Sequence, residues 1–306
     1  MPAFRTVAEG LRFPEGPVAL EDGSVLVVEI QRGTLSKVDP SGAVSVLADC
    51  GGGPNGAAIG PDGAIYVCNN GGFKWHEMGG ITAPGAQPDD YIGGRLQRVT
   101  FDGAVSNVYT TTGSDPLIGP NDIVFDAHGG CYFTDLGKMR GREMALGGLF
   151  YARPDGSRID ELVHPMIQAN GVGLSPDGSR LYVAETTPGR VWTWEVTAPG
   201  VLSSDGPGPG GATLLHGFDG YQPLDSLAVD SEGNVCVATI NTGGISVISP
   251  DGALKDVVRP PEHDPFVTNI CFGGPDLRTA YITSSGRGLL YATEWHCPGL
   301  PMHFTA

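Results

Sequence analysis

The sequence lacks the cysteine and histidine patterns by which most zinc and redox sites are recognised. Its six cysteines form no Cys-x-x-Cys pair, and its seven histidines form no His-x-His or His-Glu-x-x-His motif. A histidine-bound zinc ion is therefore not expected. Several cysteines lie in apolar runs, such as residues 66–68 (YVC) and 235–237 (VCV), so we expect buried free thiols in a reducing compartment.

Positive charge is also scarce. Lysine and arginine number 18 against 34 aspartate and glutamate residues, which gives a formal net charge of −16. Because such a surface repels phosphate backbones, a nucleic-acid partner is not expected. No run approaches the roughly 18 apolar residues that a membrane helix needs, and residues 1–5 lack the layout of a signal peptide. These absences predict a soluble cytoplasmic protein without a membrane partner.

Glycine and proline, by contrast, are abundant, with 48 and 25 residues in a chain of 306. The 40% share of hydrophobic residues excludes disorder. Frequent turn residues within an apolar chain favour many short strands joined by turns.

One phrase recurs along the chain. It consists of a polar residue after a turn, an apolar run, an Asp-Gly-like turn, and a strand of β-branched and aromatic residues. Residues 54–67 (PNGAAIGPDGAIYV) are an example. The six copies occupy residues 14–29, 54–67, 120–133, 169–183, 224–237 and 268–283.

Most copies are followed by a second hairpin, and Asp-Gly turns between alternating strands are a strong hairpin signal. Two hairpins per copy make a four-stranded antiparallel sheet. The spacing of about 40–65 residues overlaps the period of propeller repeats. The sequence therefore predicts an all-β fold, a six-bladed β-propeller of four-stranded antiparallel sheets, forming a single domain over residues 1–306.

Two stretches interrupt the repeat. Residues 73–93 lie inside the second unit, and residues 199–222, rich in glycine and proline, precede the fifth copy. Long loops without a pattern of their own are often lids or binding loops, although tolerated surface insertions are as common. The aromatic and charged residues of 73–91 favour a rim that contacts substrate.

One polar side chain opens each copy at the same register. These residues are Glu15, Asn55, Asn121, Asn170, Asp225 and Asn269. Since equivalent points of all blades lie at one end of the central channel, we expect the six side chains to converge there. Carboxylate and amide oxygens are the ligands of hard cations, and two acids would largely neutralise a divalent ion.

These residues can also be interpreted as turn formers that precede the inner strand. That interpretation suits asparagine and aspartate, but it explains poorly why Glu15, a weak turn former, takes the same register. The aspartates of the Pro-Asp-Gly turns are a different case. We expect Asp62, Asp177 and Asp251 to be hairpin residues on the outside.

The chain resembles the SMP-30/gluconolactonase/luciferin-regenerating-enzyme (LRE-like) family over essentially its whole length. The most specific pieces are, in order, residues 13–17 (FPEGP), 120–122 (PND), 170–178 (NGVGLSPDG) and 224–230 (LDSLAVD). Members of the family are six-bladed propellers that bind one divalent metal ion. The resemblance implies that Glu15, Asn170 and Asp225 are the metal ligands and that Asp225 is also the general base. Asn121 would be a further ligand, direct or through water, or a substrate contact.

The resemblance implies a small-molecule lactone substrate of the sugar or aldonolactone type. Sugar lactonases of the animal type carry an arginine two residues before the asparagine of the third blade, and here that position is Gly119. Gluconolactone, another aldonolactone and an unrelated lactone contacted by residues 73–91 all stay open. Ca²⁺ is the first candidate for the ion, and Mg²⁺, Mn²⁺, Zn²⁺ and Fe²⁺ also suit such a site.

We therefore expect a metal-dependent lactone hydrolase. A divalent ion would polarise the carbonyl, activate a water and stabilise the oxyanion, and Asp225 would accept the proton of the water. Asn55, Asn121 and Asp122 are the expected substrate contacts. The leaving alkoxide would take a proton from Asp122, from bulk water or from the newly protonated Asp225. Without a Gly-x-Ser-x-Gly nucleophile elbow, no covalent step is expected.

Two other functions stay open. The same scaffold can carry an esterase or phosphotriesterase. A non-catalytic binding propeller with a structural metal is the other alternative, although the Gly-His and Trp-Asp signatures of WD40 repeats are missing.

Overall fold

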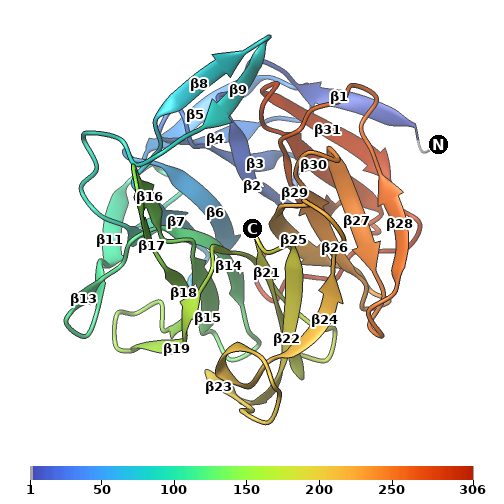
Figure 1. Ribbon diagram of the computed structural model, residues 1–306. Helices are drawn as coiled ribbons and strands as arrows, with labels where there is room; N and C mark the ends of the chain where they lie inside the picture. Colours follow the sequence, from blue (N-terminus) through green and yellow to red (C-terminus); the bar gives the residue numbers. More distant parts are fainter. Residues whose placement is uncertain (1–2, 306) are drawn as a thin grey trace.

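The computed structural model describes residues 3–305, which form six antiparallel sheets arranged around a central axis (Figure 1). Each sheet is one blade. In the first five blades the strand nearest the axis comes first in the chain. In the sixth blade it also precedes its two neighbours, but the outermost strand comes from the N-terminal part of the chain. This arrangement confirms the predicted all-β, six-bladed propeller of four-stranded antiparallel sheets.

From the innermost strand outward, the first blade is β2 (Pro14–Ala19), β3 (Val25–Glu29), β4 (Thr34–Val38) and β5 (Val44–Asp49). The second is β6 (Pro54–Ile59), β7 (Ile65–Asn69), β10 (Arg95–Val99) and β11 (Val105–Tyr109). The third is β14 (Pro120–Phe125), β15 (Cys131–Asp135), β18 (Gly147–Ala152) and β19 (Ile159–Met166).

The fourth blade is β20 (Ala169–Leu174), β21 (Arg180–Glu185), β22 (Arg190–Ala198) and β24 (Thr213–Gly217), with β23 (Val201–Leu202) also paired to β22. The fifth is β25 (Leu224–Val229), β26 (Val235–Thr239), β27 (Gly244–Ile248) and β28 (Leu254–Val258). The sixth is β29 (Val267–Gly273), β30 (Thr279–Ser284), β31 (Leu289–Glu294) and β1 (Phe4–Ala8).

The N-terminal strand closes the ring. β1 pairs antiparallel with β31, with Phe4 opposite Thr293. The sixth blade therefore combines one strand from the N-terminal part of the chain with three from the C-terminal part. The innermost strands of the first and sixth blades, β2 and β29, also contact each other. The first and last blades therefore hold each other in place, as in other closed propellers.

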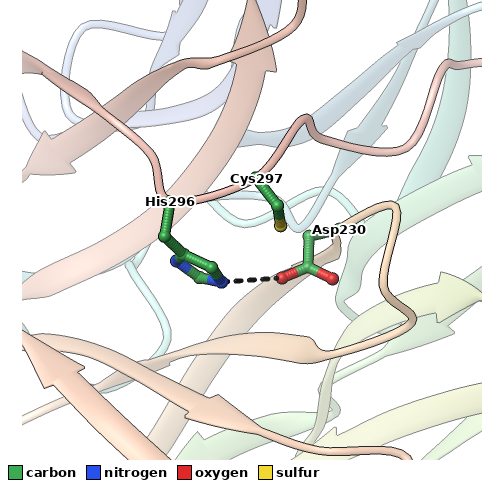
Figure 2. Close-up of side chains that lie close together, drawn as sticks. All are labelled: Asp230, His296 and Cys297. Atoms are coloured by element: carbon green, nitrogen blue, oxygen red, sulfur yellow. Dashed lines mark ion pairs between the residues drawn. The ribbon is translucent and has the colours of Figure 1, made fainter.

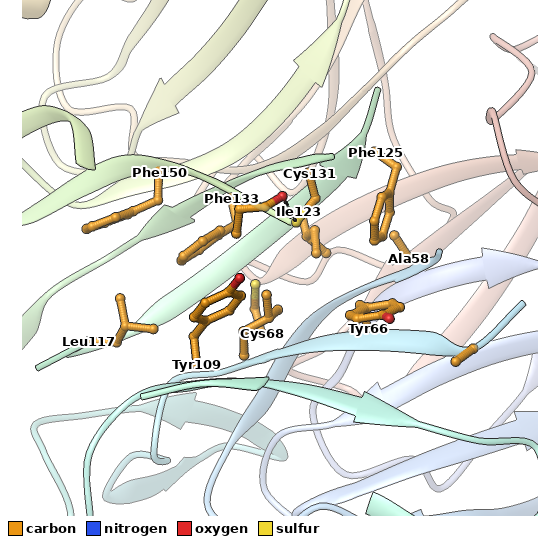
Figure 3. Close-up of a cluster of buried hydrophobic side chains, with 13 residues drawn as sticks. Ala58, Tyr66, Cys68, Tyr109, Leu117, Ile123, Phe125, Cys131, Phe133 and Phe150 are labelled. Atoms are coloured by element: carbon orange, nitrogen blue, oxygen red, sulfur yellow. Dashed lines mark hydrogen bonds between the residues drawn. The ribbon is translucent and has the colours of Figure 1, made fainter. Parts of the chain in front are cut away.

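Apolar side chains fill the spaces between neighbouring blades. Between the second and third blades, the rings of Tyr66 and Phe125 meet edge to face with centroids 5.3 Å apart (Figure 3). In the same cluster Phe133 stacks on Phe150 with centroids 5.1 Å apart. All six cysteines are free thiols and five of them are buried, as the sequence predicted.

Each innermost strand has an irregular pairing next to the aligned polar residue. In β6 the register shifts between Pro54 and Ala57, and β14, β20 and β25 shift at the equivalent place. Such a bulge re-aims side chains relative to the regular alternation of a strand. The aligned residues thus lie within strands rather than in turns. This position is evidence against the alternative interpretation that they form turns.

Glycine follows the aligned residue in three blades because neighbouring strands approach closely there. A Cβ atom on Gly56 would lie 2.5 Å from Asn121 O, and one on Gly171 would lie 2.5 Å from Leu227 N. A larger residue would push the blades apart at the axis. The recurring Asn-Gly pairs are therefore explained by packing around the axis.

The Pro-Asp-Gly aspartates behave as predicted. Asp62 Oδ1 accepts the N–H of Ala64 at 3.2 Å, and Asp177 Oδ1 accepts that of Ser179 at 3.0 Å. Both bonds span two residues and stabilise hairpin turns between strands.

The chain after β31 crosses the axis where the innermost strands end. Leu300 N donates to Val229 O at 3.1 Å, which ties this segment to the fifth blade. Residues 300–305 line a channel of about 120 Å³ whose other walls come from all six innermost strands. The last described part of the chain accordingly lies near the centre of the ring in Figure 1. We call this end of the axis the bottom, and the end where the innermost strands begin the top.

The two interrupting stretches contain regular elements. Residues 73–93 include the hairpin of β8 (Trp75–Met78) and β9 (Ile81–Pro84). Residues 199–222 include β23, the 3₁₀ helix η1 (Pro209–Gly211) and β24, so part of this stretch is the outer strand of the fourth blade. Two further hairpins are β12 (Thr111–Thr112) with β13 (Asp115–Pro116) and β16 (Lys138–Arg140) with β17 (Glu143–Ala145). No helix in residues 3–305 is long and apolar enough to cross a membrane.

Candidate functional site

Five of the six aligned side chains line one cavity at the top of the propeller. They are Glu15, Asn55, Asn121, Asn170 and Asp225, each the second residue of its innermost strand. The cavity has a volume of about 450 Å³, and the 73–93 stretch and the β16–β17 hairpin contribute to its wall. The fold therefore brings together the four predicted ligands and Asn55.

Three oxygen atoms of this group have no hydrogen-bond partner among the described residues. Glu15 Oε1, Asn55 Oδ1 and Asn121 Oδ1 are buried and unpaired. Asn170 Oδ1 accepts one long hydrogen bond of 3.4 Å from Ser226 Oγ. A buried acceptor without a donor costs roughly 1–3 kcal/mol. Several such oxygens around one cavity fit a hard cation, which takes carboxylate and amide oxygens as ligands.

The carboxyl groups near the axis are poorly stabilised as anions. Burial raises the pKa of Glu15 to about 7. Burial and then the charge of Glu15 raise the pKa of Asp122 to about 8, and the same two causes raise the pKa of Asp225 well above its ordinary value. Acids that lie together in a medium of low dielectric constant repel each other when ionised, and a cation would offset this repulsion.

Asn269, the sixth aligned residue, supports Glu15 from below instead of lining the cavity. Its Nδ2 donates to Glu15 Oε2 at 2.7 Å, and the same oxygen accepts the N–H of Gly16 at 2.7 Å. Asn269 itself lines the bottom channel. These bonds occupy Oε2 and leave Oε1 of Glu15 for a ligand in the cavity.

Asp122 also lies below the ring of aligned side chains. Its Oδ2 accepts the N–H of Val172 at 3.2 Å and its Oδ1 accepts that of Ile123 at 3.0 Å. It lines the bottom channel, and it links the third blade to the fourth. This position favours neither substrate contact nor proton donation in the top cavity.

Lys138 is a further candidate that the sequence did not predict. Lys138, the first residue of β16, lines the cavity and is 3% exposed. Its Nζ donates to Gly72 O at 2.7 Å and to Asn70 Oδ1 at 3.3 Å, and it lies 3.9 Å from the ring centroid of Phe73. Burial lowers the pKa of Lys138 to about 7, against the opposing effect of the Asp135 charge. No pattern in the sequence distinguishes this lysine from those on the surface.

Apolar side chains form much of the remaining wall. They are Phe13, Ile30, Phe73, Leu136, Met139, Met144, Ile240 and Phe266. A wall of this kind suits a small molecule with an apolar body and a few polar groups at fixed points.

Residues 13–286 match the family described as SMP-30/Gluconolactonase/LRE-like region. The protein belongs to this family. It is similar to Lactonase drp35 of Staphylococcus aureus (strain USA300), with 31% identity over 251 residues that cover 80% of this chain and 67% of the relative. It is also similar to a gluconolactonase of Zymomonas mobilis, with 26% identity over 313 residues, 92% of this chain and 79% of the relative. Its fold is similar to that of regucalcin, a calcium-binding protein of Agrobacterium tumefaciens, with a TM-score of 0.74, 17% identity and 98% of both chains covered.

In this member of the SMP-30/gluconolactonase family, the position two residues before Asn121 is closed to a side chain. A Cβ atom on Gly119 would lie 2.5 Å from Gly137 O. Asp135 Oδ1 holds the two segments together, because it accepts the N–H of Gly119 at 2.7 Å and that of Gly137 at 2.8 Å. An arginine does not fit there, and Lys138 brings a cationic side chain to the cavity from the segment that closes the position.

A second group of potential metal ligands lies at the bottom of the fifth blade. Ligand atoms of Asp230, His296 and Cys297 lie within 4.8 Å of one another (Figure 2). His296 Nε2 is 3.5 Å from Asp230 Oδ2, while Asp230 Oδ1 accepts the N–H of Asn234 at 2.9 Å within a hairpin turn. These side chains could hold a metal ion. No sequence pattern predicts this group, because residues 230 and 296 are far apart in the chain and form no motif.

Proposed function

We propose that the protein hydrolyses a small-molecule lactone and depends on one divalent cation in the top cavity. The observation that carries the proposal is the set of buried, unpaired oxygens of Glu15, Asn55 and Asn121 in one cavity with the carboxyl of Asp225. The relatives named lactonase and gluconolactonase support the reaction class.

Glu15, Asn170 and Asp225 would hold the cation, with Asn121 as a further ligand, direct or through water. Oxygen ligands of this kind suit Ca²⁺ first, and also Mg²⁺ or Mn²⁺. The relative described as a calcium-binding protein supports the same preference. When bound, such a cation supplies Lewis acidity toward the lactone carbonyl and its developing oxyanion.

Asp225 would act as the general base. It is one of the two carboxyl groups that line the cavity, and the other, Glu15, already accepts two hydrogen bonds at Oε2. Asp225 accepts a proton from the attacking water, whose oxygen forms the new bond to the carbonyl carbon. The ring C–O bond then breaks, and the alkoxide takes a proton from the Asp225 carboxyl or from bulk water. Lactone and water are thus converted to a hydroxy acid.

Asn55 and Asn121 would position the substrate. Their unpaired Oδ1 atoms can accept hydrogen bonds from hydroxyl groups of a bound molecule. Holding the ring in one orientation supports attack, because a positioned reactant loses less entropy in the transition state.

Acid release from a panel of lactones, followed with a pH indicator, tests the proposal. The panel contains gluconolactone, other aldonolactones, aliphatic lactones, an aryl ester and an organophosphate triester. We expect lactone turnover that stops after chelation with EDTA and returns when a divalent cation is added. Turnover of the aryl ester or the triester without any lactone would replace the proposal with an esterase or phosphotriesterase. A firmly bound cation without turnover would favour a binding propeller.

A further inference from the structure

The top cavity has a second polar region, and it is opposite in character to the ring of oxygens. The ring presents unpaired acceptors, whereas Lys138 presents an ammonium group to the same cavity. The apolar wall described above surrounds both. A ligand that satisfies both regions therefore needs an electron-rich group for Lys138 in addition to the lactone carbonyl.

Lys138 differs in its charge pairing from the other three lysines of the chain. Lys37, Lys74 and Lys255 are partly exposed, and their Nζ atoms lie 2.8, 2.7 and 3.6 Å from carboxylates of Asp22, Asp89 and Glu232. Lys138 is buried, yet no carboxylate in residues 3–305 lies within ion-pair distance of its Nζ. Buried charges are normally paired, because an isolated charge is costly to desolvate.

The acid whose charge acts on Lys138, Asp135, already accepts hydrogen bonds from backbone groups. Asp135 accepts the N–H of Gly119 and Gly137 at Oδ1 and that of Ile118 at Oδ2, at 2.7, 2.8 and 2.8 Å. Asp135 therefore accepts hydrogen bonds from nearby backbone N–H groups and none from Lys138, and its charge acts on Lys138 only at longer range.

Hydrogen-bond donors around Lys138 are also in excess. An ammonium group has three N–H donors, and two of them have oxygen acceptors, Gly72 O and Asn70 Oδ1. Asn70 Nδ2, on the side chain that binds Lys138, is buried and has no partner among the described residues. Lys138 lines the cavity, whereas Asn70 does not line it and holds the Lys138 ammonium through Oδ1. A buried cation that lines a cavity and lacks an acceptor for one donor indicates a missing anion.

We propose that Lys138, positioned by Asn70, forms a subsite for a carboxylate group of the ligand, so that the substrate is a lactone that carries a carboxylate. That the ligand is a lactone rests on the proposed lactonase function, whereas the carboxylate subsite is inferred from the residues of the cavity alone. A carboxylate accepts several hydrogen bonds and would pair the buried ammonium. The apolar wall suits the ring carbons of such a molecule better than a ring of hydroxyl groups.

Binding without turnover tests the subsite separately from the reaction. Pyroglutamate is a lactam with a carboxylate and is not hydrolysed like an ester, and 2-pyrrolidinone is the same ring without the carboxylate. Calorimetric titration of the Ca²⁺-loaded protein should show tighter binding of pyroglutamate. In Lys138→Met the ratio of the two affinities should fall roughly 10- to 150-fold, the effect of losing a hydrogen bond to a charged group.

Two further variants keep the test interpretable if Lys138→Met folds poorly. Asn70→Asp is nearly isosteric, and it would place a carboxylate beside the ammonium and remove the free amide donor. It should abolish the preference for pyroglutamate while leaving the affinity for 2-pyrrolidinone unchanged. Lys74→Met is the matched control, because it removes an exposed lysine of the neighbouring segment that is paired with Asp89. Its affinity ratio should equal that of the wild type.

The matched substrates are 5-oxotetrahydrofuran-2-carboxylate and γ-valerolactone, which share a lactone ring and differ in the carboxylate. A preference for the first that disappears in Lys138→Met supports both proposals. Selective binding of pyroglutamate without lactone turnover keeps the subsite and removes the lactonase. Equal affinity of the wild type for pyroglutamate and 2-pyrrolidinone, or an unchanged ratio in a folded Lys138→Met and in Asn70→Asp, would overturn the subsite.

Discussion

Asn269 Nδ2 donates a hydrogen bond of 2.7 Å to Glu15 Oε2 and so joins the sixth blade to the first beneath the top cavity. The bond fixes the carboxyl group so that Oε1 is the oxygen without a partner. Groups that orient a metal ligand typically contribute about 10- to 100-fold to metal affinity. Calcium titration of Asn269→Ala should therefore show a loss of affinity in that range.

Asn107→Ala is the control for this variant, since Asn107 is an exposed asparagine on β11. Its calcium affinity should equal that of the wild type. An Asn269→Ala protein with full affinity would mean that Glu15 needs no support from the sixth blade.

Replacement of Asp225 should remove turnover without unfolding the chain. Asp225→Asn keeps the shape of the side chain but cannot accept the proton of the water. We expect kcat to fall roughly 10²- to 10⁴-fold, the usual contribution of a general base. Lactone turnover and the unfolding temperature should be measured together with those of Asp251→Asn, a variant of the exposed Pro-Asp-Gly turn. Near-wild-type turnover in Asp225→Asn would remove Asp225 from the mechanism.

Close packing at the axis makes Gly171 sensitive to any side chain. In Gly171→Ala the new Cβ would meet the backbone nitrogen of Leu227 at 2.5 Å, so the fourth and fifth blades must separate. Overpacking of this kind typically costs about 1–3 kcal/mol of unfolding free energy. Urea unfolding should show such a loss, whereas Gly217→Ala should change little, because its Cβ would meet only Leu214 Cδ2 at 3.7 Å. Equal stability of the two variants would contradict the packing argument.

The preference for a carboxylate ligand should depend on pH through Lys138. Burial lowers the pKa of this lysine to about 7, with Asp135 as the facing acid, so the ammonium is present below pH 7 and is lost above it. The ratio of pyroglutamate to 2-pyrrolidinone affinity should therefore be constant at low pH. It should fall by up to tenfold per pH unit above about 7, because only the protonated form pairs with the carboxylate. Calorimetric titrations between pH 6 and 9 measure this ratio.

Lys138→Arg separates charge from other effects of pH. A guanidinium stays protonated over this range, so the ratio should become independent of pH even where the absolute affinities drop. A ratio that falls with pH in the arginine variant as well would assign the dependence to another group.

Metal analysis distinguishes the top cavity from the group at the bottom of the fifth blade. Cys297→Ser removes one side chain of the Asp230, His296 and Cys297 group and leaves the cavity untouched. We expect the cation that supports turnover to be retained in Cys297→Ser and lost in Glu15→Gln. Retention of activity and cation in Glu15→Gln, with loss of both in Cys297→Ser, would relocate the functional metal to the bottom group.

The number of blades and the ring of polar residues could be predicted from the sequence because both are encoded locally. A hairpin turn such as the one at Asp62 forms between adjacent residues, and the aligned residues keep one position at the start of each innermost strand. Repetition of a local pattern in a closed ring then carries Glu15, Asn170 and Asp225 to one end of the axis.

What only the tertiary structure decided is which side chains face the cavity and which face elsewhere. Asn269, an aligned residue, and Asp122, which follows the aligned Asn121, bond to neighbouring blades below the cavity instead of lining it. Lys138 became a candidate because Phe73 and Gly72, from another blade, bury it. Burial and hydrogen-bond partners depend on contacts between segments that are distant in the chain. A periodic sequence pattern does not specify these contacts.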